Sequence, residues 1–392
     1  MLRFGATRVL ASMSHALFTA ARHGCEHRMR AASLGNTPRA LSSISKNQGR
    51  FRVPCATSVS ASWLASPRAH EHRVRRRHVS ATSESNSADS NTETASSIYD
   101  NPALYEMAFG FRDFDHEVLF LNSLSKKHGA GEMTSVLEIG AGPAWHSVAC
   151  VTSLPHSVIA VAIDNSHSML ERAKQRAREF GCETKIEVVE GDMTALDVEG
   201  IKGKARELLA KSTIGTDDKT DTEFTGFDCA TILLGTAAHL VETEHAIACF
   251  QSASKLLNPT GILILELEHP YDLFDGQLMD AQGDAWDREV EGDEHTKVLV
   301  EWGREGDYFD VETHVVERTV GINVVDGKGL PKNGFTPIEE TVTCKIFTCP
   351  EIHLLARLAG LKVVATYGDM DIDVPLTHED AHNMIVVLKR DD

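Results

Sequence analysis

The chain has 392 residues, with 39 basic and 57 acidic side chains and a formal net charge of −18 at pH 7. Residues 1–79 hold fourteen Lys and Arg but only two acids, Glu26 and Glu71. Residues 80–392 are left with 25 basic and 55 acidic side chains, a net charge of about −30. Such an acidic body repels phosphate backbones, which argues against a nucleic-acid partner. No apolar run is long enough to span a bilayer, so we also expect no membrane partner.

The first 79 residues are basic and rich in Ser and Ala, the composition of an organelle transit peptide. The opening through Arg22 mixes apolar and basic residues in a loosely amphipathic pattern. We therefore expect import into the mitochondrial matrix, with the plastid stroma as the alternative. A basic nucleic-acid arm, a disordered tail or wrongly predicted coding sequence would also account for this composition. Residues 80–97 are polar and predict a disordered linker before a domain at 98–392.

Six cysteines lie in this body, at positions 150, 182, 229, 249, 344 and 349. They show neither CxxC pairing nor the Cys/His spacing of a zinc site, so we predict no metal site. Most of them lie in apolar runs, where a cysteine is usually a small reduced core residue.

The body begins with helical patterns over 105–128 and then alternates short apolar strands with helices. Continuous apolarity in the strands is typical of a parallel sheet covered on both faces. The predicted fold is an α/β doubly wound, Rossmann-like, seven-stranded sheet with helices on both faces. Strands are expected at 136–139, 158–163, 186–189, 229–234, 262–266, 361–366 and 383–388.

Two segments depart from this alternation. Residues 200–226 are polar and contain an acidic run, which predicts a surface insertion. Residues 270–347 contain strand-like pieces that predict an antiparallel insertion after the fifth strand, acting as a substrate lid. Thr348-Cys-Pro-Glu351 then forms a capping box that opens a helix ending at Gly360.

The strongest motif is Val136-Leu-Glu-Ile-Gly-Ala-Gly-Pro-Ala-Trp-His146, a strand followed by a glycine-rich turn and a helix start. Glycines allow a ligand to approach the backbone, and the free N–H groups of a helix start attract anions. Ala144 and Trp145 stand where a dinucleotide fingerprint needs glycine, so that fingerprint is incomplete. Glu138, two residues before the first glycine, favours a ligand that carries an ammonium group.

On these residues the chain, from about Tyr99 to Arg390, resembles the class I S-adenosylmethionine-dependent methyltransferases. Glu138-Ile-Gly-Ala-Gly is similar to the first motif of that family. The resemblance implies S-adenosyl-L-methionine as the cofactor. Its methionine end would be held by Glu138, Gly140, Ala141 and Gly142. Ala144 departs from the family, many of whose members have a third glycine there.

Later strand ends match the same family. Asp164 follows the second strand, where an acid can accept hydrogen bonds from both ribose hydroxyls. The resemblance implies that Asn165 lies against the adenine, that Asp192 accepts from its amine and that Met193 packs on the ring. Leu234, after the fourth strand, completes the expected cofactor contacts.

The ends of strands four and five also supply the expected acceptor pocket, from Thr236, His239, Glu266, Glu268 and His269. We predict His269 or His239 as the catalytic base or orienting group. Glu266 is a third candidate, because an acid inside an apolar strand is costly unless it is paired. Each histidine has an ordinary alternative as a structural side chain, and Glu266 has one as the partner of a buried Arg or Lys.

The segment from Tyr99 to Arg112 resembles the flap that closes over the cofactor in small-molecule methyltransferases. Tyr105 is expected to face the sulfonium by cation–π attraction, and Arg112 to hold a carboxylate. The alternatives are a tyrosine that packs at the core edge and an arginine paired with Asp113 or Asp115.

The leading hypothesis is therefore methyl transfer to a small molecule at N, O or S, by in-line displacement at the sulfonium carbon. The Asn/Asp-Pro-Pro-aromatic motif that the family uses on nucleic-acid bases or glutamine is absent after the fourth strand, where the sequence reads Leu233-Leu-Gly-Thr-Ala-Ala-His-Leu240. Alternatives are an organellar protein methyltransferase, or an assembly factor that keeps the fold without catalysis. A nicotinamide-dependent oxidoreductase ranks last, because no second dinucleotide-binding half follows.

Overall fold

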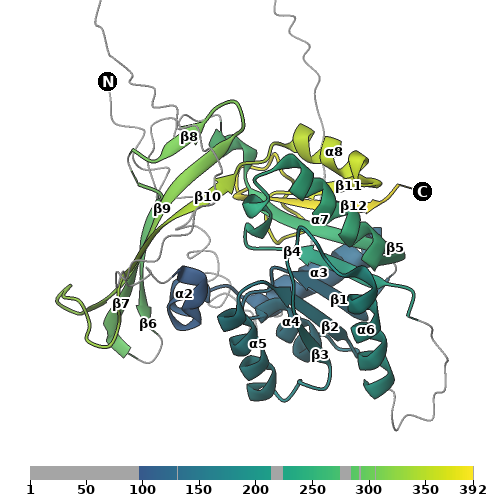
Figure 1. Ribbon diagram of the computed structural model, residues 1–392, viewed down its shortest axis with the longest axis horizontal. Helices are drawn as coiled ribbons and strands as arrows, with labels where there is room; N and C mark the ends of the chain where they lie inside the picture. Colours follow the sequence, from purple (N-terminus) through teal and green to yellow (C-terminus); the bar gives the residue numbers. More distant parts are fainter. Residues whose placement is uncertain are drawn as a thin grey trace, which may run out of the picture. The chain divides into compact units, whose positions relative to one another are not determined.

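Two β-sheets organise the part of the chain that the computed structural model describes (Figure 1). The described residues are 97–129, 131–212, 224–273, 284–290, 293–304 and 306–391. They belong to one compact unit. The predicted transit peptide at 1–79 and the linker residues 80–96 lie outside these ranges. Within the described ranges, no helix has the length and apolarity needed to cross a membrane.

The larger sheet has seven strands in the order β11-β12-β5-β4-β1-β2-β3. From β3 to β5 neighbouring strands are parallel, and β12 runs antiparallel to both of its neighbours. This confirms the predicted doubly wound sheet. Its strands are β1 (Ser135–Ile139), β2 (Ile159–Asp164), β3 (Ile186–Glu190), β4 (Phe227–Ile232), β5 (Leu257–Glu268), β11 (Leu361–Tyr367) and β12 (Asn383–Arg390).

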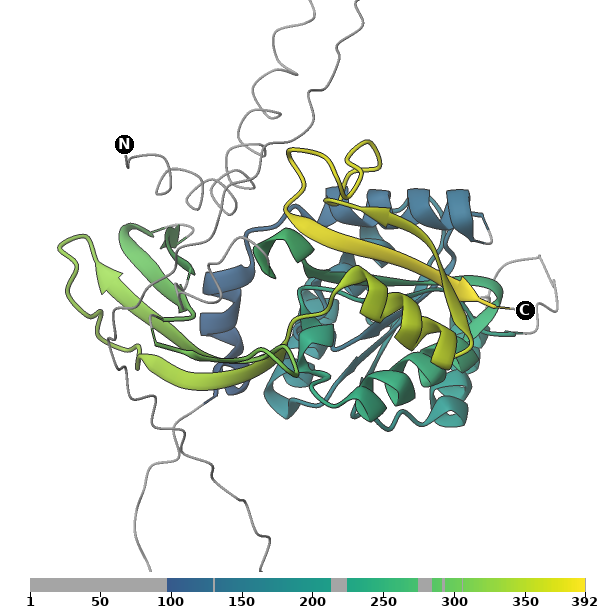
Figure 2. The same ribbon diagram turned by 90° about the horizontal axis from the view of Figure 1, so that it is seen from above.

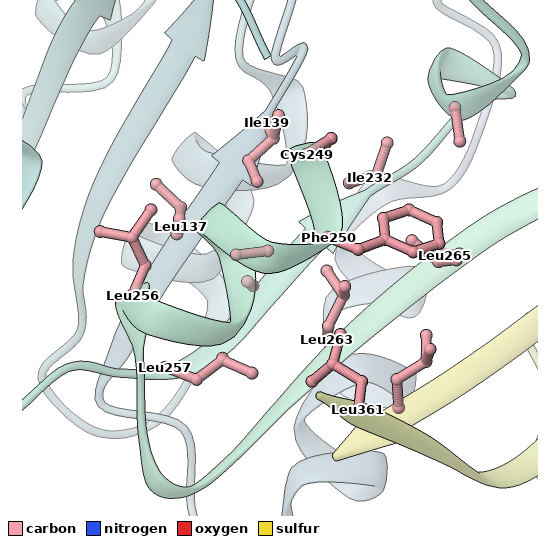
Figure 3. Packing of buried hydrophobic residues seen from close by; sticks show 14 of the residues in the cluster. Leu137, Ile139, Ile232, Cys249, Phe250, Leu256, Leu257, Leu263, Leu265 and Leu361 are labelled. Carbon is pink, nitrogen blue, oxygen red and sulfur yellow. The ribbon is translucent and has the colours of Figure 1, made fainter. Parts of the chain in front are cut away.

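Helices pack on both faces of this sheet through alternate strand residues. Leu137 and Leu263 lie on one face with α6 (Val198–Ser212), α7 (Thr243–Leu256) and α8 (Cys349–Leu358). Val136 and Ile264 lie on the other face with α3 (Phe114–His128), α4 (Trp145–Ser153) and α5 (His167–Glu179). Figure 3 shows Phe250 and Cys249 of α7 in the same cluster as Leu137, Ile232 and Leu265. Burying side chains of this size contributes about 1.5 to 3 kcal/mol each, and this burial holds the sheet between its helices.

The helix ends follow local sequence signals. The side chain of Thr348 accepts a hydrogen bond from the amide of Glu351, and a proline occupies the first turn of α8, as the capping box predicts. Ser166 caps α5 by accepting from the amide of Met169. Asp113 caps α3 by accepting from the amide of His116. Each side-chain oxygen satisfies a backbone donor that the helix leaves free.

The interpretation of residues 200–226 as a surface insertion needs correction. Their first half belongs to α6, which buries Ile201, Ala205 and Leu208 in the same cluster as β2. This helix is the crossover between parallel strands β3 and β4. Its polar outer face and Gly203 obscured the helical pattern. The acidic run at 217–223 lies outside the described residues.

The second sheet is antiparallel, with the order β10-β9-β7-β6 and with β8 paired to β9. It stands between β5 and α8 in the chain, which confirms the predicted insertion; β6 was not anticipated. Val298, Val320 and Ile322 pack against Leu104 and Ala108 of the N-terminal helix α2. These strands are β6 (Asp284–Val290), β7 (Asp293–Trp302), β8 (Tyr308–Asp310), β9 (Val315–Asp326) and β10 (Ile338–Lys345).

Four short helical segments complete the described fold. They are η1 (Ile98–Asp100), α2 (Pro102–Phe109), η2 (Thr236–His239) after β4 and η3 (Pro270–Leu273) after β5. Figure 2 shows α2 between the second sheet and the helices of the first. The strand order reverses between β1 and β4, and ligands of open α/β sheets bind at the carboxyl ends of the strands at such a point. The candidate site is therefore at the loops that follow β1 and β4.

Candidate functional site

The glycine-rich turn after β1 adopts left-handed backbone angles at three positions, Gly140, Gly142 and Ala144. A Cβ at Gly140 would overlap the side chain of Thr236 in the loop after β4, so only glycine fits this close approach. A Cβ at Gly142 would meet no atom within 4 Å, which leaves space beside its backbone. Ala144 has a left-handed φ of 57° although it is not glycine, and it is fully buried at the start of α4.

Asp164, at the end of β2, is held at this turn. Its carboxylate accepts hydrogen bonds from the amides of Gly142 at 2.7 Å and Ser166 at 2.8 Å. Burial raises its pKa despite these bonds. Two backbone donors thus orient the carboxylate that was expected to bind the ribose, and they bring the ends of β1 and β2 together.

Glu138 is almost fully buried at the end of β1. One carboxylate oxygen accepts from the amide and the hydroxyl of Ser147, at 2.9 and 2.5 Å. The other lies 3.3 Å from Nδ1 of His146. A carboxylate has about four acceptor positions, so a further donor can still bind.

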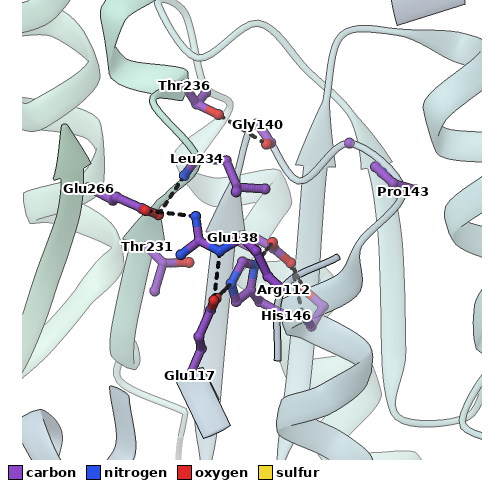
Figure 4. A network of polar contacts seen from close by, with 12 residues as sticks. Arg112, Glu117, Glu138, Gly140, Pro143, His146, Thr231, Leu234, Thr236 and Glu266 are labelled. Atoms are coloured by element: carbon purple, nitrogen blue, oxygen red, sulfur yellow. Dashed lines mark hydrogen bonds and ion pairs between the residues drawn. The ribbon is translucent and has the colours of Figure 1, made fainter. Parts of the chain in front are cut away.

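A chain of polar contacts leads from Glu138 to the loop after β4 (Figure 4). His146 Nε2 lies 2.8 Å from Glu117, and Arg112 bridges Glu117 at 2.6 Å and Glu266 at 2.7 Å. Glu266 also accepts a 2.8 Å hydrogen bond from the amide of Leu234. In this structure Arg112 therefore pairs with Glu117 and Glu266 rather than with the alternatives Asp113 and Asp115.

Neighbouring charges shift the pKa values of Arg112 and Glu117 in this cluster. Burial alone lowers the pKa of Arg112, but Glu266 and Glu117 raise it above its ordinary value. Burial raises the pKa of Glu117, yet Arg112 and His146 bring it below its ordinary value. Arg112 and Glu117 are therefore ionised at neutral pH, and each has a partner of opposite charge.

Aromatic rings from the N-terminal segment cover the turn. Tyr105 and Phe114 each stack on Trp145, with ring centroids 5.7 and 4.9 Å apart. The pKa of Tyr105 is raised by burial and by the nearby charges of Asp164, Glu138 and Glu266. Tyr105 thus lies close to the candidate cofactor residues, as the flap prediction requires.

The two predicted histidines lie in different surroundings. Burial lowers the pKa of His239, and its Nε2 lies 3.0 Å from the hydroxyl of Tyr99. His269 has backbone partners on both ring nitrogens, the carbonyl of Leu376 at 2.9 Å and the amide of Tyr271 at 3.2 Å. His239 also makes a hydrogen bond to the backbone of Thr343, so in this structure both histidines fit their structural alternative, and burial favours the neutral form of His239.

The polar residues predicted to contact the adenine are more exposed than Glu138 and Asp164. Asp192 is exposed and accepts from the amide and hydroxyl of Thr194, and Asn165 is exposed as well. Met193 packs against the core beside β3. Exposed polar groups and a thioether at the carboxyl ends of β2 and β3 remain available to a flat ring. Glu268 instead forms a two-point contact with Arg318 of β9, which joins the two sheets.

Sequence reasoning assigned no role to four residues near this site: Glu117, Trp145, His146 and Asp369. Glu117 lies one helical turn after Phe114, on the face that carries Leu121, and a charge at such a position signals a buried partner. Asp369 follows β11. Burial raises its pKa, and Glu266 and Arg112 are near enough to act on it.

The residues fit a cofactor that carries an ammonium group and a ribose. Glu138 and Asp164 supply carboxylate acceptors at neighbouring strand ends, and the turn between them has open space at Gly142. Carboxylates at these ends suit ribose hydroxyls and a cation better than the phosphates of a dinucleotide.

Known proteins support this reading of the fold. Residues 136–204 match a family model described as a methyltransferase domain. An S-adenosylmethionine-dependent methyltransferase from Clostridium acetobutylicum is 13% identical, with a TM-score of 0.52 over 73% of this chain and 96% of that chain. DesVI from Streptomyces venezuelae is 16% identical, with a TM-score of 0.51 over 73% of this chain and 97% of that chain. No curated protein matches the sequence.

Proposed function

We propose that this chain, which has the class I methyltransferase fold and a match to a methyltransferase domain over residues 136–204, transfers a methyl group from S-adenosyl-L-methionine to a small-molecule acceptor. The observation that carries the proposal is the hydrogen bond between Gly142 and Asp164, with Glu138 at the neighbouring strand end. When bound, the cofactor would supply an activated methyl group. Glu138 would hold its ammonium group, Asp164 its ribose, and Asp192 and Met193 its adenine.

The chain's own contribution is alignment and exclusion of water, which in-line displacement mainly requires. Tyr105, Trp145 and Phe114 form an aromatic cover, and the second sheet packs against the helix that carries Tyr105. A covered site suits a small acceptor better than a folded protein or a nucleic acid, and the acidic body disfavours the latter. His239 would take a proton from an acceptor that arrives protonated, because burial keeps its imidazole neutral near pH 7.

Calorimetric titration of the full chain with S-adenosylmethionine and S-adenosylhomocysteine tests the cofactor. We expect micromolar binding that is lost in Asp164→Asn. The matched control is Asp371→Asn, a substitution of an exposed turn carboxylate that accepts a hydrogen bond from the amide of Asp373. No binding by folded wild-type protein would overturn the proposal and leave a non-catalytic assembly factor. Binding followed by labelling of protein rather than small metabolites would overturn the acceptor class.

We also propose that residues 1–79 direct the protein to the mitochondrial matrix, on their basic, acid-poor composition. Fusing them to a fluorescent protein tests this. Mitochondrial fluorescence would support the proposal, and plastid or diffuse fluorescence would contradict it.

A further inference from the structure

His146 is the link between two carboxylates that come from different elements. It lies in the first turn of α4 and is 1% exposed. Nδ1 faces Glu138 of β1 at 3.3 Å, and Nε2 faces Glu117 of α3 at 2.8 Å. The ring of Phe114 packs edge-on against the imidazole, with centroids 5.0 Å apart.

Both ring nitrogens can donate only when the imidazole carries two protons. Burial favours the neutral ring, but hydrogen bonds to Glu117 and Glu138 raise the pKa of His146 to about 9. The doubly protonated ring separates two buried negative charges that would otherwise repel each other. Arg112 supplies the second cation on the far side of Glu117.

Glu138 receives most of its orientation from α4. Ser147 donates twice to one carboxylate oxygen, and His146 is the partner of the other. Without His146, that second oxygen would lose its partner, and an unsatisfied buried charge is costly. It would also be free to turn away from the ligand space beside the glycine-rich turn.

We propose that His146 is a positioning residue that holds Glu138 ready for the ammonium group of the cofactor. The proposal rests on the proposed function, in which Glu138 binds that group. The imidazolium itself does not touch the ligand; it acts through Glu138. Its link through Glu117 and Arg112 to Glu266 ties this orientation to the loop after β4.

Two substitutions separate the two bonds of His146. The amide nitrogen of Asn replaces Nδ1, which faces Glu138, and that of Gln replaces Nε2, which faces Glu117. His146→Gln therefore removes the donor to Glu138, whereas His146→Asn keeps it. The control is His128→Gln, a substitution of a half-buried histidine that bonds Tyr367 outside this cluster.

Two probes separate positioning from general support of the fold. S-adenosylhomocysteine carries the ammonium group, and 5′-methylthioadenosine lacks it but keeps the adenosine. Calorimetry on the full chain should show that His146→Gln weakens the binding of S-adenosylhomocysteine roughly tenfold or more. The affinity of His146→Gln for 5′-methylthioadenosine should be unchanged. His146→Asn should keep most of the wild-type affinity for both probes.

The outcomes are distinct. Equal weakening of both probes in His146→Gln would assign His146 a structural role and overturn the proposal, as would unchanged binding of S-adenosylhomocysteine. If His146→Gln does not fold, the test depends on folded His146→Asn, which keeps the donor to Glu138. Weak binding of S-adenosylhomocysteine by this variant, together with normal binding of 5′-methylthioadenosine, would overturn the role assigned to the Nδ1 bond. Wild-type protein that binds neither probe would overturn the proposed function, and this inference with it.

Discussion

The carboxylate of Glu266, on β5, accepts a 2.8 Å hydrogen bond from the amide of Leu234, whose φ of 55° is left-handed. A non-glycine residue in this region costs about 1 to 2 kcal/mol, so the surrounding contacts must hold it there. Strained backbone of this kind clusters at functional sites. The loop after β4 is thus held by a buried acid whose second oxygen pairs with Arg112.

Arg112→Lys is expected to destabilise the fold, although it keeps the charge. The guanidinium contacts Glu117 and Glu266 with two separate nitrogens, a fork that one ammonium group cannot reproduce. A poorly satisfied buried carboxylate costs about 1 to 3 kcal/mol, to be measured by urea unfolding. Arg304→Lys is the control, because Arg304 is exposed beside Glu301 and Glu339; an equal loss there would contradict the prediction.

Stability should fall as the pH rises from about 6.5 to about 9. His146 has a folded-state pKa of about 9, above the unfolded value of about 6.5. Its contribution, on the order of 3 kcal/mol, is therefore complete below pH 6.5 and lost as the pH passes through 9. Denaturant midpoints across this range should decline in wild type and decline less in His146→Gln. An equal decline of the midpoint in wild type and in His146→Gln would show that other groups govern the loss of stability at high pH.

Glu106→Ala should loosen α2 without unfolding the sheet. Glu106 pairs with both Arg172 and Arg176 of α5, and these contacts hold the helix that carries Tyr105. We expect faster proteolysis and faster hydrogen exchange over residues 98–110. Glu171→Ala removes an exposed pair with Lys174 and should leave both rates unchanged. Unchanged exchange in Glu106→Ala would show that the aromatic stack alone holds α2.

Asp228→Asn should reduce stability and spare cofactor binding. Asp228 accepts from Thr134, Ser135 and Asn258 at the amino ends of β1 and β4, the opposite end of the strands from Asp164. The amide can accept with only one of its two heteroatoms, so we expect a loss of about 1 to 3 kcal/mol in urea unfolding. Loss of S-adenosylhomocysteine affinity in a folded variant would contradict the assignment of the site to the carboxyl ends.

The sheet was predictable because its strands contain short apolar runs, and the strands β1, β2 and β4 are each followed by a helix. The capping box at Thr348 and the glycine-rich turn act over a few residues, so they appear in the sequence as they do in the structure. Helix α6 was missed because it buries only Ile201, Ala205 and Leu208, which stand among two glycines and many charged residues. Its place became clear only from packing against β2 and β3.

The candidate site divides in the same way. The sequence by itself determined that Glu138, Gly142 and Asp164 stand at strand ends, since strand and turn signals are local. Only the tertiary structure decided that Arg112 pairs with Glu266, 154 residues away, and that His146 joins Glu117 to Glu138. The partners of a buried charge are chosen by which elements pack together, and that packing follows from burial of the whole core.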